Sequence, residues 1–174
     1  MDIIELLLSL TGLFMPIIFL MLMLAMRSSR AHIVKVNNLL FGNWKILSIL
    51  LAFWAIVFSF YYSFVIGYNP CKLCWYQRYI LYAIFFVLLV FIKKPIRKPV
   101  MLLAAIGSII AFYQYVIQML TLNGIQVTEI CSVNGISCSI PNFVSFGFVT
   151  IPLMSLFTFL FLFLFAYNGK AIKK

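Results

Sequence analysis

The stretch NPCKLCWYQR, residues 69–78, separates two long apolar segments and decides how the rest of the chain is arranged. Asn69 is a favoured N-cap residue, and Pro70 is favoured at the first position of a helix. We therefore predict a helix that begins here, with Cys71 and Cys74 in its opening turns. This CxxC pair, at the edge of an apolar segment, is the candidate reactive site of the protein.

The electrostatic surroundings of the CxxC motif favour reactive cysteines. The N-terminal end of a helix carries partial positive charge. Lys72 adds a charge beside the pair, and Arg78 lies one helical turn beyond Cys74 on the same face. Positive charge stabilises the thiolate, which is the nucleophilic form of cysteine. The sequence thus predicts a redox-active pair and not two inert thiols.

The composition of the chain is that of an integral membrane protein. Of its 174 residues, 66% are apolar and 18% are aromatic, which leaves too little polar surface to coat a water-soluble globule. In a soluble domain the net charge of +10 would suggest binding to nucleic acid. Here the basic residues lie in clusters between apolar runs, as topology signals do, so we expect no nucleic-acid partner.

Five apolar segments are candidates for membrane-spanning helices, against about 20 residues needed to cross a bilayer. They cover residues 6–26, 46–66, 76–92, 100–121 and 147–167. We predict an all-α integral membrane protein with a four-helix transmembrane bundle and one additional N-terminal transmembrane helix. Pro16 would kink the first segment, so an interfacial helix is the alternative there.

The basic clusters define the expected topology. Three segments hold most of the Lys and Arg residues, namely Arg27, Arg30, Lys35 and Lys45, then Lys93, Lys94, Arg97 and Lys98, then Lys170, Lys173 and Lys174. If all five segments span, these clusters share one face, which the positive-inside rule places in the cytoplasm. We divide the chain into an N-terminal span and connector (1–45), a bundle with two external cysteine loops (46–168) and a basic tail (169–174).

The second external connection carries the other two cysteines, Cys131 and Cys138. Asn134 and Gly135 between them are a strong turn signal, so the chain can bring the two sulfurs within bonding distance. A structural disulfide is one interpretation, since closing so small a ring stabilises a fold by about 2–3 kcal/mol. We favour an exchange relay, because the CxxC pair lies on the same side of the membrane.

A metal site is the further alternative for four cysteines. Structural zinc usually takes closely spaced pairs, and Cys131 and Cys138 are widely spaced. Haem attachment requires a histidine directly after the CxxC motif, where this chain has Trp75. We therefore expect no metal.

Polar residues inside the apolar segments are candidate ligand-binding groups. Arg78 lies about one turn inside the third segment, where a charge is costly unless it snorkels or is paired. We expect its guanidinium to stabilise the Cys74 thiolate and to donate to a docked carbonyl, with Gln77 as a second donor. Gln114 and Gln118 share a helix face. Bonding between helices is their default role, and lining a quinone pocket is the sharper hypothesis.

These features together resemble the DsbB/BdbC family of quinone-linked, disulfide-generating membrane proteins, especially its Bacillus-type branch. The resemblance rests on PCKLCWYQR at residues 70–78, the looped cysteine pair and GFVTIP at residues 147–152, and it covers about residues 46–168. It implies a multi-pass protein of the bacterial cytoplasmic membrane with its redox cysteines on the extracytoplasmic side. It also implies a membrane quinone, ubiquinone or menaquinone, as cofactor and a DsbA- or BdbD-like thioredoxin-fold protein as partner.

The resemblance also implies a division of roles among the cysteines. The reduced partner would attack the Cys131–Cys138 disulfide and form a mixed disulfide with Cys131. Electrons would then pass to Cys71 and Cys74. The Cys74 thiolate would meet the quinone beside Arg78.

Two other functions are compatible with the sequence. A vitamin K epoxide reductase-like enzyme also couples membrane thiols to a quinone, but in that family the loop cysteines precede the CxxC motif and here they follow it. A non-enzymatic membrane scaffold with structural disulfides is the alternative from another class. Redox cycling with a quinone distinguishes an enzyme from a scaffold.

Overall fold

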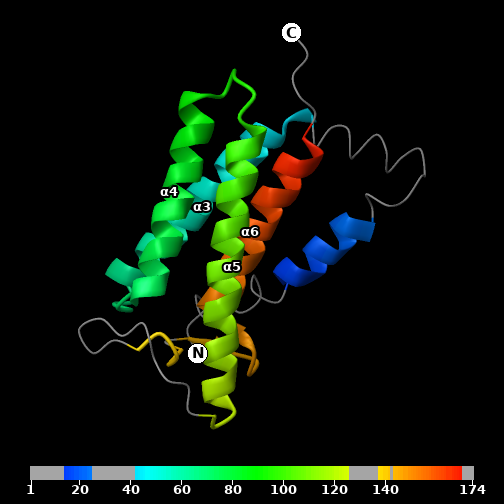
Figure 1. Ribbon diagram of the computed structural model, residues 1–174. Coiled ribbons are helices and arrows are strands. Elements are labelled where there is room, and N and C mark those ends of the chain that lie inside the picture. Colours follow the sequence, from blue (N-terminus) through cyan, green and yellow to red (C-terminus); the bar gives the residue numbers. More distant parts are fainter. Residues whose placement is uncertain (1–13, 25–41, 126–136, 142, 170–174) are drawn as a thin grey trace.

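Four long apolar helices dominate the structure (Figure 1). The computed structural model describes residues 14–24, 42–125, 137–141 and 143–169. Within these ranges, four helices are long and apolar enough to cross a membrane: α3 (Trp44–Phe64), α4 (Lys72–Val90), α5 (Arg97–Leu122) and α6 (Ile151–Asn168). The predicted all-α membrane fold with a four-helix bundle is confirmed.

The four helices form an antiparallel bundle in which each helix packs against two others. Helix α3 contacts α4 and α6, and α5 contacts the same two. The approach of α5 to α6 depends on Gly107, because a Cβ atom there would lie 2.6 Å from ring atoms of Phe159. Small residues at such contacts favour association in a bilayer, where lipid tails supply no hydrophobic driving force between helices.

The side chain of Lys45 on α3 hydrogen-bonds the segment that follows α4, at the end of the bundle distant from the CxxC motif. Its ammonium group donates to the carbonyls of Ile92 and Lys94 at 2.5 and 2.7 Å. These carbonyls follow the last turn of α4, where unpaired carbonyls and the helix dipole favour a cation. Lys45 is therefore a structural residue as well as a member of a basic cluster.

An N-terminal apolar helix, Phe14–Leu24, packs beside α6 (Figure 1). The ring of Phe19 makes edge-to-face contacts with Phe157 and Phe161, at centroid distances of 5.8 and 5.2 Å. Within the described residues this helix is shorter than a span requires. The extra helix predicted from residues 6–26 is thus present, and the rest of that segment lies outside the described residues.

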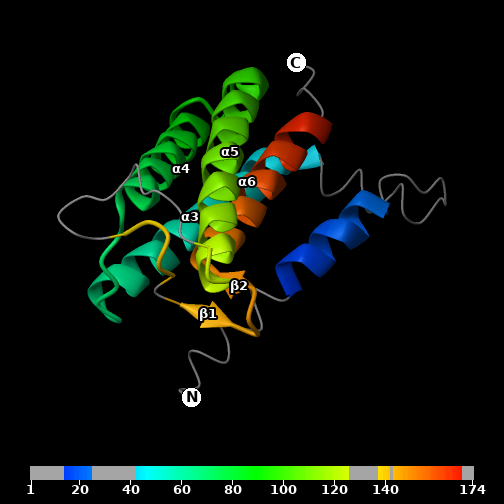
Figure 2. The same cartoon turned by 60° about the horizontal axis from the view of Figure 1, so that its bottom comes forward.

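A short β-hairpin lies at the cysteine-bearing end of the bundle (Figure 2). Strand β1 (Val144–Ser145) pairs antiparallel with β2 (Val149–Thr150), which leads directly into α6. Phe146 and Gly147 in the turn have φ angles of 52° and 77°, in the left-handed region. The predicted segment 147–167 therefore contains a spanning helix, but this helix begins only at Ile151, because a helix cannot pass through the turn.

The helix that carries the CxxC motif also begins later than predicted. Helix α4 starts at Lys72, and Cys71 is its N-cap residue with extended backbone, at φ −74° and ψ 175°. The carbonyl of Cys71 accepts the N–H of Trp75 at 3.2 Å, which is the first bond of the helix. The predicted N-cap at Asn69 is therefore wrong. Cys74 lies in the first turn, at the positive end of the helix, and Cys71 lies just outside it.

Candidate active site

The two cysteines of the CxxC motif face each other at the start of α4. Their Sγ atoms are 3.1 Å apart and form a hydrogen bond between two thiols. Cys71 is only 4% exposed. Cys74 lies on the opposite side of this contact, where it borders a large cavity.

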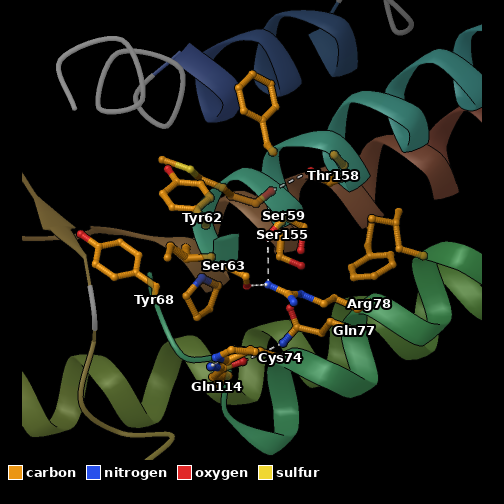
Figure 3. Close-up of a pocket in the computed structure, with 18 of the residues that line it drawn as sticks. Ser59, Tyr62, Ser63, Tyr68, Cys74, Gln77, Arg78, Gln114, Ser155 and Thr158 are labelled. Carbon is orange, nitrogen blue, oxygen red and sulfur yellow. Dashed lines mark hydrogen bonds between the residues drawn. The ribbon is translucent and has the colours of Figure 1, made fainter. Parts of the chain in front are cut away.

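A pair of buried glutamines contacts both sulfurs. Gln114 Nε2 on α5 donates to Cys71 Sγ and to Cys74 Sγ, each at 3.3 Å. Gln77 Nε2 on α4 donates to Gln114 Oε1 at 2.8 Å. Figure 3 shows Gln114 next to Cys74, with Gln77 on the adjacent turn of α4. The two amides thus join α4 to α5 directly at the sulfur pair.

The segment after α5 brings Cys138 against the CxxC motif. Cys138 is 1% exposed and packs with Cys71 and Ile117 in one buried cluster. Gln118 Nε2 donates to the carbonyl of Cys138 at 3.3 Å, which fixes this segment to α5. The predicted disulfide to Cys131 lies outside the described residues.

The reduced CxxC pair is asymmetric. The hydrogen bond with Cys74 and the burial of the side chain raise the pKa of the Cys71 thiol well above its usual range. Burial and this contact therefore disfavour a thiolate at Cys71. The prediction that positive charge makes the CxxC pair reactive stays a prediction.

A cavity of about 260 Å³ opens beside Cys74 (Figure 3). All four bundle helices contribute to its largely apolar wall, and Met15 of the N-terminal helix also lines it. The polar side chains that line the cavity include Ser59, Ser63 and three of the predicted ligand-binding residues, Gln77, Arg78 and Gln114. Gln118 lines a second, small cavity of about 30 Å³ on the side of Cys138.

Arg78 is held by polar and aromatic partners inside the bundle. Its Nη2 donates to the Ser59 carbonyl at 3.0 Å and to the Ser63 hydroxyl. Its guanidinium lies over the Trp75 ring, 5.3 Å from the centroid. Among the described residues these hydrogen bonds use Nη2 alone, so other N–H groups remain for an acceptor in the cavity.

Ser59 and Ser63 are site residues that the sequence analysis did not single out. They are four residues apart on α3 and so share the helix face that meets Arg78. Polar side chains at helical spacing inside an apolar segment are the signal that could have identified them.

The structure places most of the predicted site residues together. Those in the described ranges are Cys71, Cys74, Cys138, Gln77, Arg78, Gln114 and Gln118. Across those ranges, no group of three or more His, Cys, Asp or Glu side chains is placed to hold a metal ion. The site therefore consists of sulfur atoms, amides and one guanidinium. The role of the glutamines and of Arg78 in quinone binding stays a prediction.

Comparison with known proteins gives a family and a set of relatives. The family of disulfide bond formation protein DsbB matches residues 42–168. The SPbeta prophage-derived disulfide bond formation protein B of Bacillus subtilis is 39% identical over 108 residues, which cover 60% of this chain and 70% of the relative. The helix Phe14–Leu24 lies outside the part that the family matches.

Two further relatives are similar over more of the chain. The probable disulfide formation protein of Oceanobacillus iheyensis is 34% identical over 129 residues, covering 72% of this chain and 84% of the relative. Disulfide bond formation protein C of Bacillus subtilis is 32% identical over 124 residues, covering 70% and 84%. No solved structure matches the chain.

Proposed function

Because this chain belongs to the DsbB family of disulfide bond formation proteins, we propose that it is a membrane thiol:quinone oxidoreductase that generates disulfides de novo. The family and the four spans identify a multi-pass membrane protein of disulfide bond formation. In the proposal, a DsbA-like thioredoxin-fold partner is reoxidised through Cys131 and Cys138, then through Cys71 and Cys74. Two electrons leave to a membrane quinone.

The observation that carries the proposal is the contact between Cys138 and Cys71. The two residues come from separate connections of the chain, yet both are buried in one cluster next to Cys74. Two purely structural disulfides would need no such contact between the two cysteine pairs. Thiol–disulfide exchange does need it, because the attacking sulfur must reach the sulfur it attacks.

The proposed exchange conserves disulfides and charge at each step. A partner thiolate attacks Cys131, which breaks the Cys131–Cys138 bond and releases Cys138 as a thiolate. The Cys138 thiolate attacks Cys71 of the oxidised CxxC pair, which forms the Cys71–Cys138 bond and releases Cys74 as a thiolate. The partner's second thiol loses its proton to solvent and attacks the partner's first sulfur, which forms the partner's disulfide and releases Cys131 as a thiolate. The Cys131 thiolate attacks Cys138, which forms the Cys131–Cys138 bond again and releases Cys71, and Cys71 takes up a proton. The CxxC pair is left reduced by two electrons.

The cavity beside Cys74 has the composition expected of a quinone site. Small-molecule sites are mostly apolar with a few convergent polar groups and commonly measure about 300–1,000 Å³, and this cavity of about 260 Å³ is close to that range. Arg78 and Gln77 line it and would donate to a carbonyl oxygen. A quinone bound there would accept two electrons and two protons. The chain's own task is to hold Cys74 at the cavity wall.

The proposal places the cysteine-bearing end of the bundle on the extracytoplasmic side of a bacterial cytoplasmic membrane. Lys93 and Lys94, between α4 and α5, and Arg97, the first residue of α5, lie at the opposite end. Basic residues prefer the cytoplasmic side. A soluble thioredoxin-fold partner would then approach Cys131 from outside the cell membrane.

The first test is whether Cys71 and Cys138 can be joined. The double variant Cys74→Ser/Cys131→Ser leaves these two cysteines and should form an intramolecular disulfide on mild oxidation, detected by mass spectrometry after proteolysis. The matched variant Cys71→Ser/Cys131→Ser leaves Cys74 and Cys138 and should form far less. Equal linkage in both variants, or none in either, would contradict the relay.

Activity gives the second half of this test. Purified protein with a short-tailed quinone should oxidise a reduced thioredoxin-fold protein, with one quinol formed for each disulfide. Cys74→Ser and Cys131→Ser should each abolish this turnover. A scaffold with structural disulfides would show no turnover with any quinone.

A further inference from the structure

We propose that Gln114 is a catalytic residue of the CxxC pair, and that its amide donates to the sulfur that becomes negatively charged when the Cys71–Cys74 disulfide opens. This inference rests on the proposed function, since it assigns a role within the same exchange step. It gives Gln114 a role as a donor to the cysteines, in addition to the role in quinone binding that the sequence predicts.

The hydrogen bonds of Gln114 direct its amide nitrogen at the two sulfurs. Gln114 Nε2 donates to Cys71 Sγ and to Cys74 Sγ, each at 3.3 Å, so the amide faces the gap between them. Its Oε1 accepts from Gln77 Nε2 at 2.8 Å. The side chain also lines the cavity beside Cys74.

Gln77 fixes which end of the Gln114 amide faces the sulfurs. A glutamine can present its oxygen or its nitrogen, and a carbonyl oxygen facing a thiolate would repel it. Because Gln77 donates to Oε1, Gln114 must present Nε2 to the cysteines. Gln114 is 1% exposed and Gln77 is 7% exposed, so water does not compete for these groups. Gln77 is accordingly a positioning residue for Gln114.

The exchange step explains why a donor is needed at this place. When Cys138 attacks Cys71, the Cys71–Cys74 bond breaks and negative charge passes from Cys138 to Cys74. A disulfide sulfur is a weak acceptor, whereas a thiolate is a strong one. A hydrogen bond to a charged group is about twice as strong as one between neutral groups. The contact from Gln114 therefore strengthens as the bond breaks, which favours the reduced form of the pair.

The test measures the redox equilibrium of the CxxC pair without quinone or partner. The protein carries Cys131→Ser/Cys138→Ser and is purified free of quinone in detergent. It is held in dithiothreitol redox buffers until the ratio of oxidised to reduced protein is constant. The ratio is then read by maleimide labelling and mass spectrometry. Replacing Gln114 by Leu should shift the equilibrium about tenfold towards the disulfide.

Related variants separate charge stabilisation from packing. Gln114→Glu should shift the equilibrium in the same direction at least as far, because a carboxylate faces the sulfurs. The double variant Gln77→Leu/Gln114→Leu leaves neither amide unpaired, so it should fold and show the full shift. Tyr113→Phe, on the exposed face of α5, should leave the equilibrium unchanged.

These measurements distinguish a failure of the role assigned to Gln114 from a failure of the proposed function. If Gln114→Leu and the double variant both stay within about twofold of the parent, a margin of about 0.4 kcal/mol, the role assigned to Gln114 is overturned. If they shift the equilibrium but the parent protein oxidises no partner, the donor role stands and the quinone-linked function fails.

Discussion

A charged side chain inside an apolar helix is costly unless it is paired, and Arg78 is paired on three sides. A serine carbonyl and a serine hydroxyl accept from Nη2, and an indole ring lies under the guanidinium plane. These partners are neutral, so the positive charge itself is not cancelled. Arg78 therefore supplies a fixed charge to the cavity wall that Cys74 shares.

Replacing Arg78 should affect the two half-reactions differently. We expect Arg78→Ala to raise the KM for a short-tailed quinone about ten- to hundredfold, since a hydrogen bond to a charged group contributes about 1.5–3 kcal/mol. The KM of Arg78→Lys should lie between those of the parent and of Arg78→Ala, because lysine keeps the charge but lacks the planar guanidinium group with its several N–H donors. Steady-state kinetics with varied quinone gives the first comparison.

The control for this prediction is the step that uses no quinone. In a single turnover, the rate at which oxidised enzyme transfers its disulfide to the reduced partner should fall less in the Arg78 variants than the rate of quinone reduction does. An equal loss of rate in both half-reactions would show that Arg78 has only a structural role, as a residue that hydrogen-bonds α4 to α3.

The helices show how far the sequence alone can predict this fold. Apolar segments of sufficient length identified α3, α4 and α5 to within a few residues, because the bilayer imposes length and composition on every span. The exact starts of α4 and α6 were not predicted. Both depend on backbone angles at Cys71 and Gly147, which composition does not specify.

Most of the residues of the site could be predicted from the sequence, but the contacts between them could not. The sequence shows that Gln114 and Gln118 share a helix face, but not that one amide meets the CxxC sulfurs and the other the carbonyl of Cys138. These contacts depend on how α4 and α5 pack, which no local pattern encodes. The spacing of Ser59 and Ser63 could have identified them as candidates, but not Arg78 as their partner, which lies on another helix.

The helix Phe14–Leu24 offers a matched pair of methionines for testing whether it closes the cavity. Met15 lines the cavity, whereas Met21 is 65% exposed. We expect Met15→Trp to raise the KM for quinone about tenfold, because filling an occupied site costs about 1–3 kcal/mol. Met21→Trp should leave it unchanged. The same result for both substitutions, in steady-state assays, would show that this helix is not a wall of the site.

The orientation of the whole bundle can be measured with single cysteines in a protein whose four native cysteines are serine. Asn123→Cys, at the end of α5, should react with a membrane-impermeant maleimide in intact cells. Lys94→Cys, after α4, should react only once the membrane is opened, because the basic cluster is expected in the cytoplasm. The reverse pattern would place the CxxC motif in a reducing compartment and contradict disulfide generation.

Helix α5 is longer than its neighbours, and its length sets the depth of the cysteines. Its 26 residues correspond to about 39 Å, against a hydrocarbon core of about 30 Å. A helix this long must tilt or project beyond the lipid tails. Through Gln118 it carries the Cys138 segment, and through Gln114 it holds the start of α4.

Bilayer thickness therefore acts on the two cysteine pairs together. A thinner or thicker membrane changes the tilt of the bundle and the height at which a partner meets it. The distance from Cys138 to Cys71 stays the same, because one rigid helix sets the depth of both.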